Sequence, residues 1–171
     1  MTNEQKEHFL LKIGDFEGFR STAYYCPARC LSIGFGHRIR DNERKRLSLA
    51  KLTFKQAFEL LKQDFEKCLS CFNDSNIILE ENELYALADI VYNCGWTTYC
   101  KGSLPKLALL YSDALNNYQY KRADELKQQI CKKMLDYCHY KRDGKVYVSK
   151  GLQSRRQFDV SIFNGTNPIL K

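Results

Sequence analysis

Long apolar runs are missing from this sequence. A membrane-spanning helix needs about 20 mostly apolar residues, and no segment approaches that length. A secretory signal needs about 7–15 apolar residues behind a basic start. The N-terminal candidate, Phe9, Leu10 and Leu11, is followed at once by Lys12 and is too short. We therefore expect no stable membrane insertion and no signal peptide in this sequence, and hence a cytoplasmic location.

Proline and glycine are also scarce, with 3 and 9 residues among 171. So few chain breakers do not favour a long flexible linker. Hydrophobic residues make up 44% and charged residues 27%, which is ordinary for a globular protein. Because this length suffices for a buried core, we expect a single domain over residues 1–171.

Acidic residues are outnumbered by basic ones, which gives a formal net charge of +7. A basic protein favours polyanions, which include nucleic acid, anionic lipid and negatively charged cell wall. The charge alone does not choose among them. No recognisable nucleic-acid-reading motif accompanies it, so we expect no nucleic-acid partner.

Cysteine is abundant, with 8 residues, but its context does not favour a disulfide framework. Without an export signal, reduced thiols are the default. Cys68 and Cys71 form the only close pair, and they lack the second pair or nearby histidine that a zinc site needs. Cys68 also falls on the apolar stripe of a helical pattern. We therefore expect buried thiols, no metal and no cofactor.

Apolar spacing predicts a mostly helical chain with one small sheet. Residues 3–16 show helical spacing, whereas residues 19–40 are rich in strand formers punctuated by Pro27, Gly34 and Gly36. Residues 41–52 look charged and irregular. Thr53 is a candidate N-cap for the next helix. That helix should run about five turns and end at the polar run Asn73, Asp74, Ser75 and Asn76.

The second half of the chain repeats the helical pattern. Gly95 is a plausible stop for a helix over 80–93. Further helices are expected over residues 103–117, 121–138 and 152–164. The predicted fold class is thus α+β and mostly α-helical. A small antiparallel β lobe, about 19–52, should adjoin a larger helical lobe, about 53–171 plus the N-terminal helix. A cleft between such lobes is a natural ligand site.

Glu17 is the first candidate catalytic residue. It lies where the first helix gives way to extended chain, with Phe16 before it and Gly18 and Phe19 after it. A carboxyl among aromatic groups can lose solvent and keep its proton, as a general acid must. An isolated glutamate is nevertheless far more often a solvated or salt-bridged one.

The residues around Glu17 form an ordered set of motifs that resembles the phage-type lysozymes, a glycoside hydrolase family of endolysins and muramidases. The family places a glutamate before a glycine, then an aspartate or sometimes a cysteine, then a threonine. Glu17, Cys26 and Ser32 fall on these positions. The glycine-rich hairpin is matched by Ile33, Gly34, Phe35, Gly36 and His37.

Three later motifs extend the resemblance to residue 156. Residues 88–95 resemble the family's central helix with its aromatic-Asn-x-Gly end, and residues 102–104 resemble its Ser-Thr-Leu element. Residues 151–156 resemble the Gly-Leu-x-x-Arg-Arg signature. The resemblance implies a lysozyme-like fold and hydrolysis of the β-1,4 bond between N-acetylmuramic acid and N-acetylglucosamine in bacterial peptidoglycan.

The resemblance also implies roles for individual residues. Glu17 would be the acid, and Cys26 and Ser32 would hold the attacking water. The candidate substrate contacts are Arg38, Tyr92, Asn93 and Ser103. His37 is expected to pair with an acid, and Arg155 and Arg156 to brace the last helix.

Cys26 is the main departure from the family pattern, because glycoside hydrolysis usually uses two carboxylates. A thiol with the usual pKa of about 8.5 is mostly neutral at pH 7. Asp41 and Glu43 could supply a second carboxylate, but a charged loop makes solvated surface the simpler interpretation. Because cysteine occurs at this position in the family, we expect an active enzyme.

Several other functions stay open. A single glutamate can suffice for a lytic transglycosylase acting on the same bond. Cys26 with His37 or His139 could form the Cys-His pair of a wall peptidase. An inactive peptidoglycan-binding module is a further alternative.

Family resemblance implies a phage or prophage lysis enzyme that waits in the host cytoplasm and acts on the wall after release. We expect a monomer with peptidoglycan as its partner.

Overall fold

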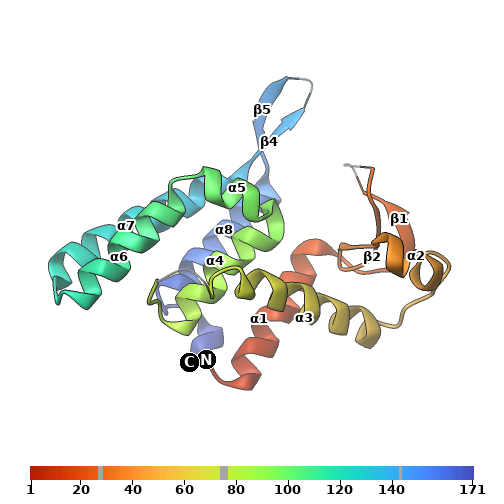
Figure 1. Ribbon diagram of the computed structural model, residues 1–171, viewed down its shortest axis with the longest axis horizontal. Coiled ribbons are helices and arrows are strands. Elements are labelled where there is room, and N and C mark those ends of the chain that lie inside the picture. Colours follow the sequence, from red (N-terminus) through yellow and green to blue (C-terminus); the bar gives the residue numbers. More distant parts are fainter. Residues whose placement is uncertain (27–28, 74–76, 143) are drawn as a thin grey trace. The chain divides into compact units, whose positions relative to one another are not determined.

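The computed structural model describes residues 1–26, 29–73, 77–142 and 144–171 (Figure 1). The chain divides into two compact units, one formed by Thr2–Lys67 and the other by Cys68–Lys171 together with Met1. As expected, the fold is mostly helical with a small three-stranded antiparallel sheet. Of the expected helix end, Asp74, Ser75 and Asn76 lie outside the described residues, as does Pro27.

The unit Thr2–Lys67 contains the sheet and the helices around it. Its elements are α1 (Asn3–Glu17), β1 (Arg20–Tyr25), β2 (Leu31–Gly34), β3 (His37–Arg38), α2 (Asp41–Leu47) and most of α3 (Phe54–Ser70). The strands are antiparallel in the order β1-β2-β3. The apolar faces of α1 and α3 meet, with the rings of Phe9 and Phe65 packed edge to face at 5.5 Å.

Helix α2 corrects the expectation of an irregular segment over 41–52. The Arg40 backbone N–H donates to Glu43 Oε2 at 3.1 Å, which satisfies a free donor at the helix start. Acidic residues in the first turn and basic residues in the last complement the helix dipole. Only Leu47 of this helix is buried, against Ile33 and Ile39. With one apolar residue in seven, this segment shows no helical period, and its charged sequence therefore predicts a loop.

The unit Cys68–Lys171 consists mainly of helices. They are α4 (Glu81–Cys94), α5 (Trp96–Lys101), α6 (Leu104–Asn116), α7 (Tyr120–Leu135) and α8 (Lys150–Phe163), with short 3-10 turns at Asp136–Cys138 and Pro168–Leu170. The hairpin of β4 (His139–Arg142) and β5 (Lys145–Val148) projects from this unit (Figure 1). Four of the five helices match the predicted ranges closely. The apolar spacing predicts neither α5 nor the β4–β5 hairpin. No helix among the described residues has the length and apolar character needed to cross a membrane.

A buried charge network joins α4 to α8. Asp89 accepts two hydrogen bonds from Arg155, at 2.8 and 2.7 Å. Arg156 lies 3.5 Å from Asp89 and 3.2 Å from Asp159. All four side chains are buried. Arg155 and Arg156 therefore brace the last helix, as expected from the sequence.

The two aspartates of this network differ in charge. Burial alone would raise the pKa of Asp89, but Arg155 and Arg156 outweigh burial and lower it. The pKa of Asp159 is raised well above its usual value, first by burial and then by the negative charge of Asp89. These opposite shifts favour a negative charge on Asp89 and a proton on Asp159.

Neutralising each aspartate separately tests this assignment. Asp89→Asn removes the only ionised carboxylate beside two buried guanidinium groups, so it should lower the free energy of unfolding by roughly 3–5 kcal/mol. Asp159→Asn replaces one neutral side chain by another of the same shape and should cost less than about 1 kcal/mol. Urea unfolding at pH 7 measures both. Equal losses, or the larger loss in Asp159→Asn, would contradict the assignment.

Candidate active site

Glu17 is the last residue of α1, and Gly18 ends that helix. Gly18 has φ +75°, and its N–H donates to the Gly14 carbonyl at 2.9 Å. Glycine adopts this left-handed conformation without the cost that a side chain would add. The turn at Gly18 leads directly into β1, so Glu17 lies between a rigid helix and the first strand.

The turn between β2 and β3 lies beside the Glu17 carboxylate. Gly36 in this turn has φ +86°, and a Cβ atom built on it would lie 3.6 Å from Glu17 Oε2. Gly34 also has a positive φ, and a Cβ there would approach the Ala57 Cβ of α3 to 3.0 Å. The two glycines therefore allow the turn to pass closely between α3 and the end of α1. The carboxylate of Glu17 faces backbone at this point.

One face of the sheet carries the other predicted residues of this unit. Ser32 on β2 pairs with Tyr24 on β1 and with Arg38 on β3. Directly paired residues of antiparallel strands point their side chains to the same face. Cys26 follows Tyr24 by two residues, which by strand alternation favours the same face. Its N–H donates to the Cys30 carbonyl at 2.9 Å, so its backbone continues the pairing of β1 and β2.

Tyr24 lies within electrostatic range of both Glu17 and Cys26. Burial raises the pKa of the Tyr24 phenol, the nearby Arg20 guanidinium lowers it, and the negative charges of Glu17 and Cys26 raise it further. The Arg20 guanidinium lies over the Tyr24 ring at 4.5 Å. The charges of both candidate catalytic groups thus contribute to the pKa of one phenol. The sequence indicates Tyr24 only as a strand former, because its pairing with Ser32 depends on a cross-strand register that a linear pattern does not show.

Ser32 and Arg38 differ in exposure. The Ser32 side chain is buried, and its hydroxyl lies 3.5 Å from the Cys30 carbonyl, a long hydrogen bond. Arg38 is exposed at the sheet edge. The structure thus brings Glu17, Cys26, Ser32 and Arg38 to one region of the unit Thr2–Lys67.

The remaining predicted contacts belong to the unit Cys68–Lys171. Tyr92 is half-buried near the end of α4. Asn93 is exposed, and its side-chain carbonyl accepts a hydrogen bond from Arg156 at 3.4 Å. Ser103 is exposed and precedes the first residue of α6. Their role as substrate contacts stays a prediction.

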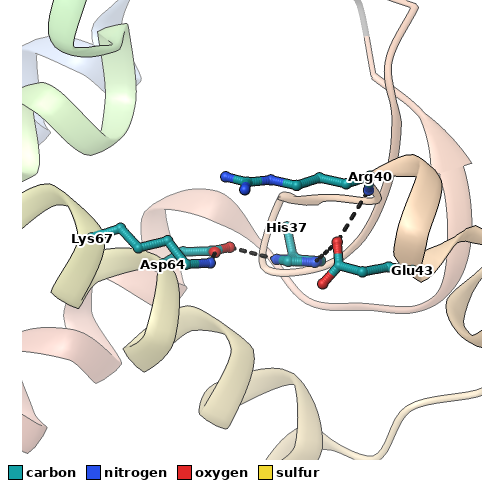
Figure 2. A network of polar contacts seen from close by, with 5 residues as sticks. All are labelled: His37, Arg40, Glu43, Asp64 and Lys67. Carbon is teal, nitrogen blue, oxygen red and sulfur yellow. Dashed lines mark hydrogen bonds and ion pairs between the residues drawn. The ribbon is translucent and has the colours of Figure 1, made fainter.

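His37 forms the centre of a polar network that holds the β2–β3 turn (Figure 2). Its Nδ1 lies 2.6 Å from Asp64 Oδ2 of α3, and its Nε2 lies 3.3 Å from Glu43 Oε2 of α2. Lys67 donates to the other oxygen of Asp64 at 2.8 Å. The Arg40 N–H completes this His37 network at Glu43. The expectation that His37 pairs with an acid is confirmed, with two acids instead of one.

The network shifts the pKa values of its members in opposite directions. The hydrogen bond to Asp64 raises the pKa of His37, although burial opposes this. Burial alone would raise the pKa of Asp64, but hydrogen bonds from His37 and Lys67 outweigh burial and lower it. For Glu43, burial is likewise outweighed by the Arg40 N–H and by His37, so its pKa is lowered. A protonated His37 between two carboxylates is the favoured state.

The same contacts bear on two open alternatives. Both ring nitrogens of His37 face carboxylates, which leaves neither aimed at Cys26 as a base. Glu43 is engaged with His37 instead of being a solvated loop residue. Among the described residues, no group of three histidine, cysteine or acidic side chains could hold a metal ion.

The His37 network predicts a pH-dependent contribution to stability. Because the pKa of His37 is raised on folding, its contribution is fully present below about pH 6.5 and is lost as the pH rises through the folded value. Because Asp64 and Glu43 have lowered pKa values, their contribution is present above about pH 4 and is lost in acid. His37→Asn should therefore lower the free energy of unfolding by roughly 1–3 kcal/mol near pH 6, and by less at pH 9.

Urea unfolding of both proteins across this pH range measures the difference. His8→Asn, at an exposed histidine of α1, is the matched control and should change the free energy by less than about 0.5 kcal/mol. A His37 contribution to the free energy of unfolding that grew from pH 6 to pH 9 would contradict the network.

Comparisons with known proteins identify the family of this chain. The family model described as phage lysozyme matches residues 14–159. An endolysin of Acyrthosiphon pisum secondary endosymbiont phage 1 is 26% identical over 159 residues, which cover 92% of this chain and 95% of that protein.

Two solved structures share the fold. The endolysin from Escherichia coli O157:H7 phage FAHEc1 is 26% identical with a TM-score of 0.70, over 95% of this chain and 93% of that one. The muramidase domain of SpmX from Asticaccaulis excentricus has a TM-score of 0.71 at 21% identity, over 91% and 94% of the two chains. With a family match over most of its length, this chain belongs to the phage lysozyme family and is a peptidoglycan-cleaving glycoside hydrolase of the lysozyme type.

Proposed function

We propose that this lysozyme hydrolyses the β-1,4 bond between N-acetylmuramic acid and N-acetylglucosamine, with Glu17 as the general acid. The observation that carries the proposal is the position of the Glu17 carboxylate. It lies at the rigid end of α1, beside the backbone of Gly36, with Cys26 close enough to act on the same tyrosine. The absence of a side chain at Gly36 would let a sugar oxygen approach the carboxyl from this side.

In the proposed reaction Glu17 donates its proton to the glycosidic oxygen as the bond from that oxygen to the anomeric carbon breaks. Water then attacks the anomeric carbon, and its surplus proton passes to solvent or back to Glu17. Charge builds up on the sugar in the transition state, which is oxocarbenium-like. The protein supplies the positioned acid, and general acid catalysis of this kind contributes about 10²–10⁴-fold to a rate.

We further propose that Cys26 and Ser32 hold the attacking water. The pairing of Tyr24 with Ser32, and the continued pairing at Cys26, support this because both side chains then point to one face. Neither group is a carboxylate. A neutral thiol and a neutral hydroxyl do not carry the negative charge that a second carboxylate would supply. Orientation of the water by a thiol and a hydroxyl is the role that their chemistry allows.

Substrate contacts and organisation are proposed from the family resemblance and the family match. Arg38, Tyr92, Asn93 and Ser103 would contact the glycan. The family match spans the boundary between the two units, which supports a single catalytic domain over residues 1–171. The protein would act as a monomer that waits in the host cytoplasm until release to the wall.

Glu17→Gln is the direct test of the acid. The variant keeps the shape of the side chain but has no proton of suitable acidity, so clearance of purified peptidoglycan should fall by about 10²–10⁴-fold. Asp15→Asn is the matched control, because Asp15 is a neighbouring carboxylate with 72% of its side chain exposed. Native-rate clearance by Glu17→Gln would refute the proposal.

Product analysis by mass spectrometry identifies the reaction. New reducing muramic acid ends are expected, whereas anhydro-muramic ends would indicate a lytic transglycosylase and new free amines a peptidase. In the same assay, Cys26→Ala should slow hydrolysis, and Cys26→Asp should restore or exceed the native rate. A Cys26→Ala protein with the native rate would remove Cys26 from the mechanism.

A further inference from the structure

The tip of the α6–α7 hairpin carries a surface hollow that the proposed catalytic site does not use. The hollow has a volume of about 610 Å³ and is lined by Tyr118, Gln119, Tyr120, Lys121, Arg122 and Glu125. A second hollow of about 400 Å³ adjoins it and is lined by Glu125, Gln128, Gln129 and Lys132. Because Glu125 lines both, they form one track along α7, the helix that follows α6 in Figure 1.

Tyr118 occupies a left-handed backbone position at the end of α6, where glycine is the favoured residue. It has φ +57° and follows the C-cap of α6. Its N–H donates to the Leu115 carbonyl at 3.1 Å, and the Gln119 N–H donates to the Ala114 carbonyl at 2.8 Å. These two bonds define a Schellman motif, in which this position is usually glycine. A bulky residue in this conformation is a rare outlier.

Burial does not compensate for this backbone conformation. Tyr118 is 77% exposed and Tyr120 is 63% exposed, so neither ring contributes much to the core. The two rings lie edge to face at 6.4 Å, which presents ring surface to solvent. Strained residues that folding does not require are found at binding sites more often than elsewhere. The pair therefore has the character of a ligand platform.

The side chains along the track are aromatic, cationic, acidic and amide-bearing. Beyond the two rings come three cations, Lys121, Arg122 and Lys132, and one carboxylate, Glu125. Gln128 and Gln129 add two side-chain amides. From Tyr120 to Lys132 the helix rises about 18 Å, at 1.5 Å per residue. This length suits a chain of linked units better than one small molecule.

We propose that this track, the α7 track, is a second binding site for the glycan strand of peptidoglycan. The apolar C–H faces of the sugar rings would stack on Tyr118 and Tyr120. The glutamine amides would hydrogen-bond hydroxyl and acetamido groups, and the excess of cations would meet the carboxylates of the stem peptides. The inference rests on the proposed function only in taking peptidoglycan as the polymer that this lysozyme meets. A second site would hold the enzyme on an insoluble wall between cleavage events.

Tyr118→Gly separates binding from folding, because it should change them in opposite directions. Glycine fits the left-handed position without cost, so the Tm should rise by about 2–4 °C. Loss of one stacking ring should raise the apparent Kd for purified sacculi by roughly 5- to 10-fold, which corresponds to about 1.0–1.4 kcal/mol. The Kd is measured by co-sedimentation in a Glu17→Gln background, so that the sacculi are not degraded, and the Tm is measured by thermal unfolding of the same proteins.

Controls and contrary outcomes are defined within the same unit. Lys106→Ala, at an exposed lysine of α6 outside the track, should leave the Kd unchanged. Soluble glycan strands freed of stem peptides should still bind the Tyr118→Gly variant more weakly in a solution binding assay, since stacking involves the sugars. An unchanged Kd, or a loss seen only with anionic lipid vesicles, would overturn the inference. Because binding is measured without turnover, its failure is distinct from a failure of Glu17 as the acid.

Discussion

The ion pair between His37 and Asp64 is the contact on which the geometry around Glu17 depends. At 2.6 Å it ties the short strand β3 to helix α3, and Glu43 ties the same imidazole to α2. A two-residue strand has few backbone hydrogen bonds of its own to hold its position. The imidazole between two carboxylates therefore fixes the β2–β3 turn, and the turn carries Gly36 to the Glu17 carboxylate.

This arrangement assigns stability and chemistry to opposite sides of one hairpin. His37 points to the helices, where its charge is held by carboxylates, whereas the neighbouring Ser32 and Arg38 pair across the other face. The cysteine at position 26, where the family pattern has a carboxylate, would then change only how the attacking water is held. The position of the acid does not depend on it. Binding to the wall through the α7 track would likewise be independent of the hydrolysis step at Glu17.

How far the sequence predicts the structure depends on the residues concerned. Strong apolar periods located most helices to within a few residues, and the motifs led to Glu17, Cys26 and Ser32 in one unit. Helix α2 was missed because only Leu47 of its residues is buried. The role of Tyr24 was missed because cross-strand register is not visible in a linear pattern. Tyr118 could not be singled out, since its significance lies in a backbone angle.

Gly36→Ala tests most directly whether the turn must lie against Glu17. A side chain at φ +86° strains the turn and brings Cβ to the carboxylate. Gly165→Ala introduces similar strain at φ +71° with nothing within 4 Å, so both variants should lose about 1 kcal/mol of stability. Only Gly36→Ala should slow peptidoglycan hydrolysis, by about tenfold or more, because small displacements of a catalytic group are costly. A folded Gly36→Ala protein that hydrolyses the wall at the native rate would contradict this expectation.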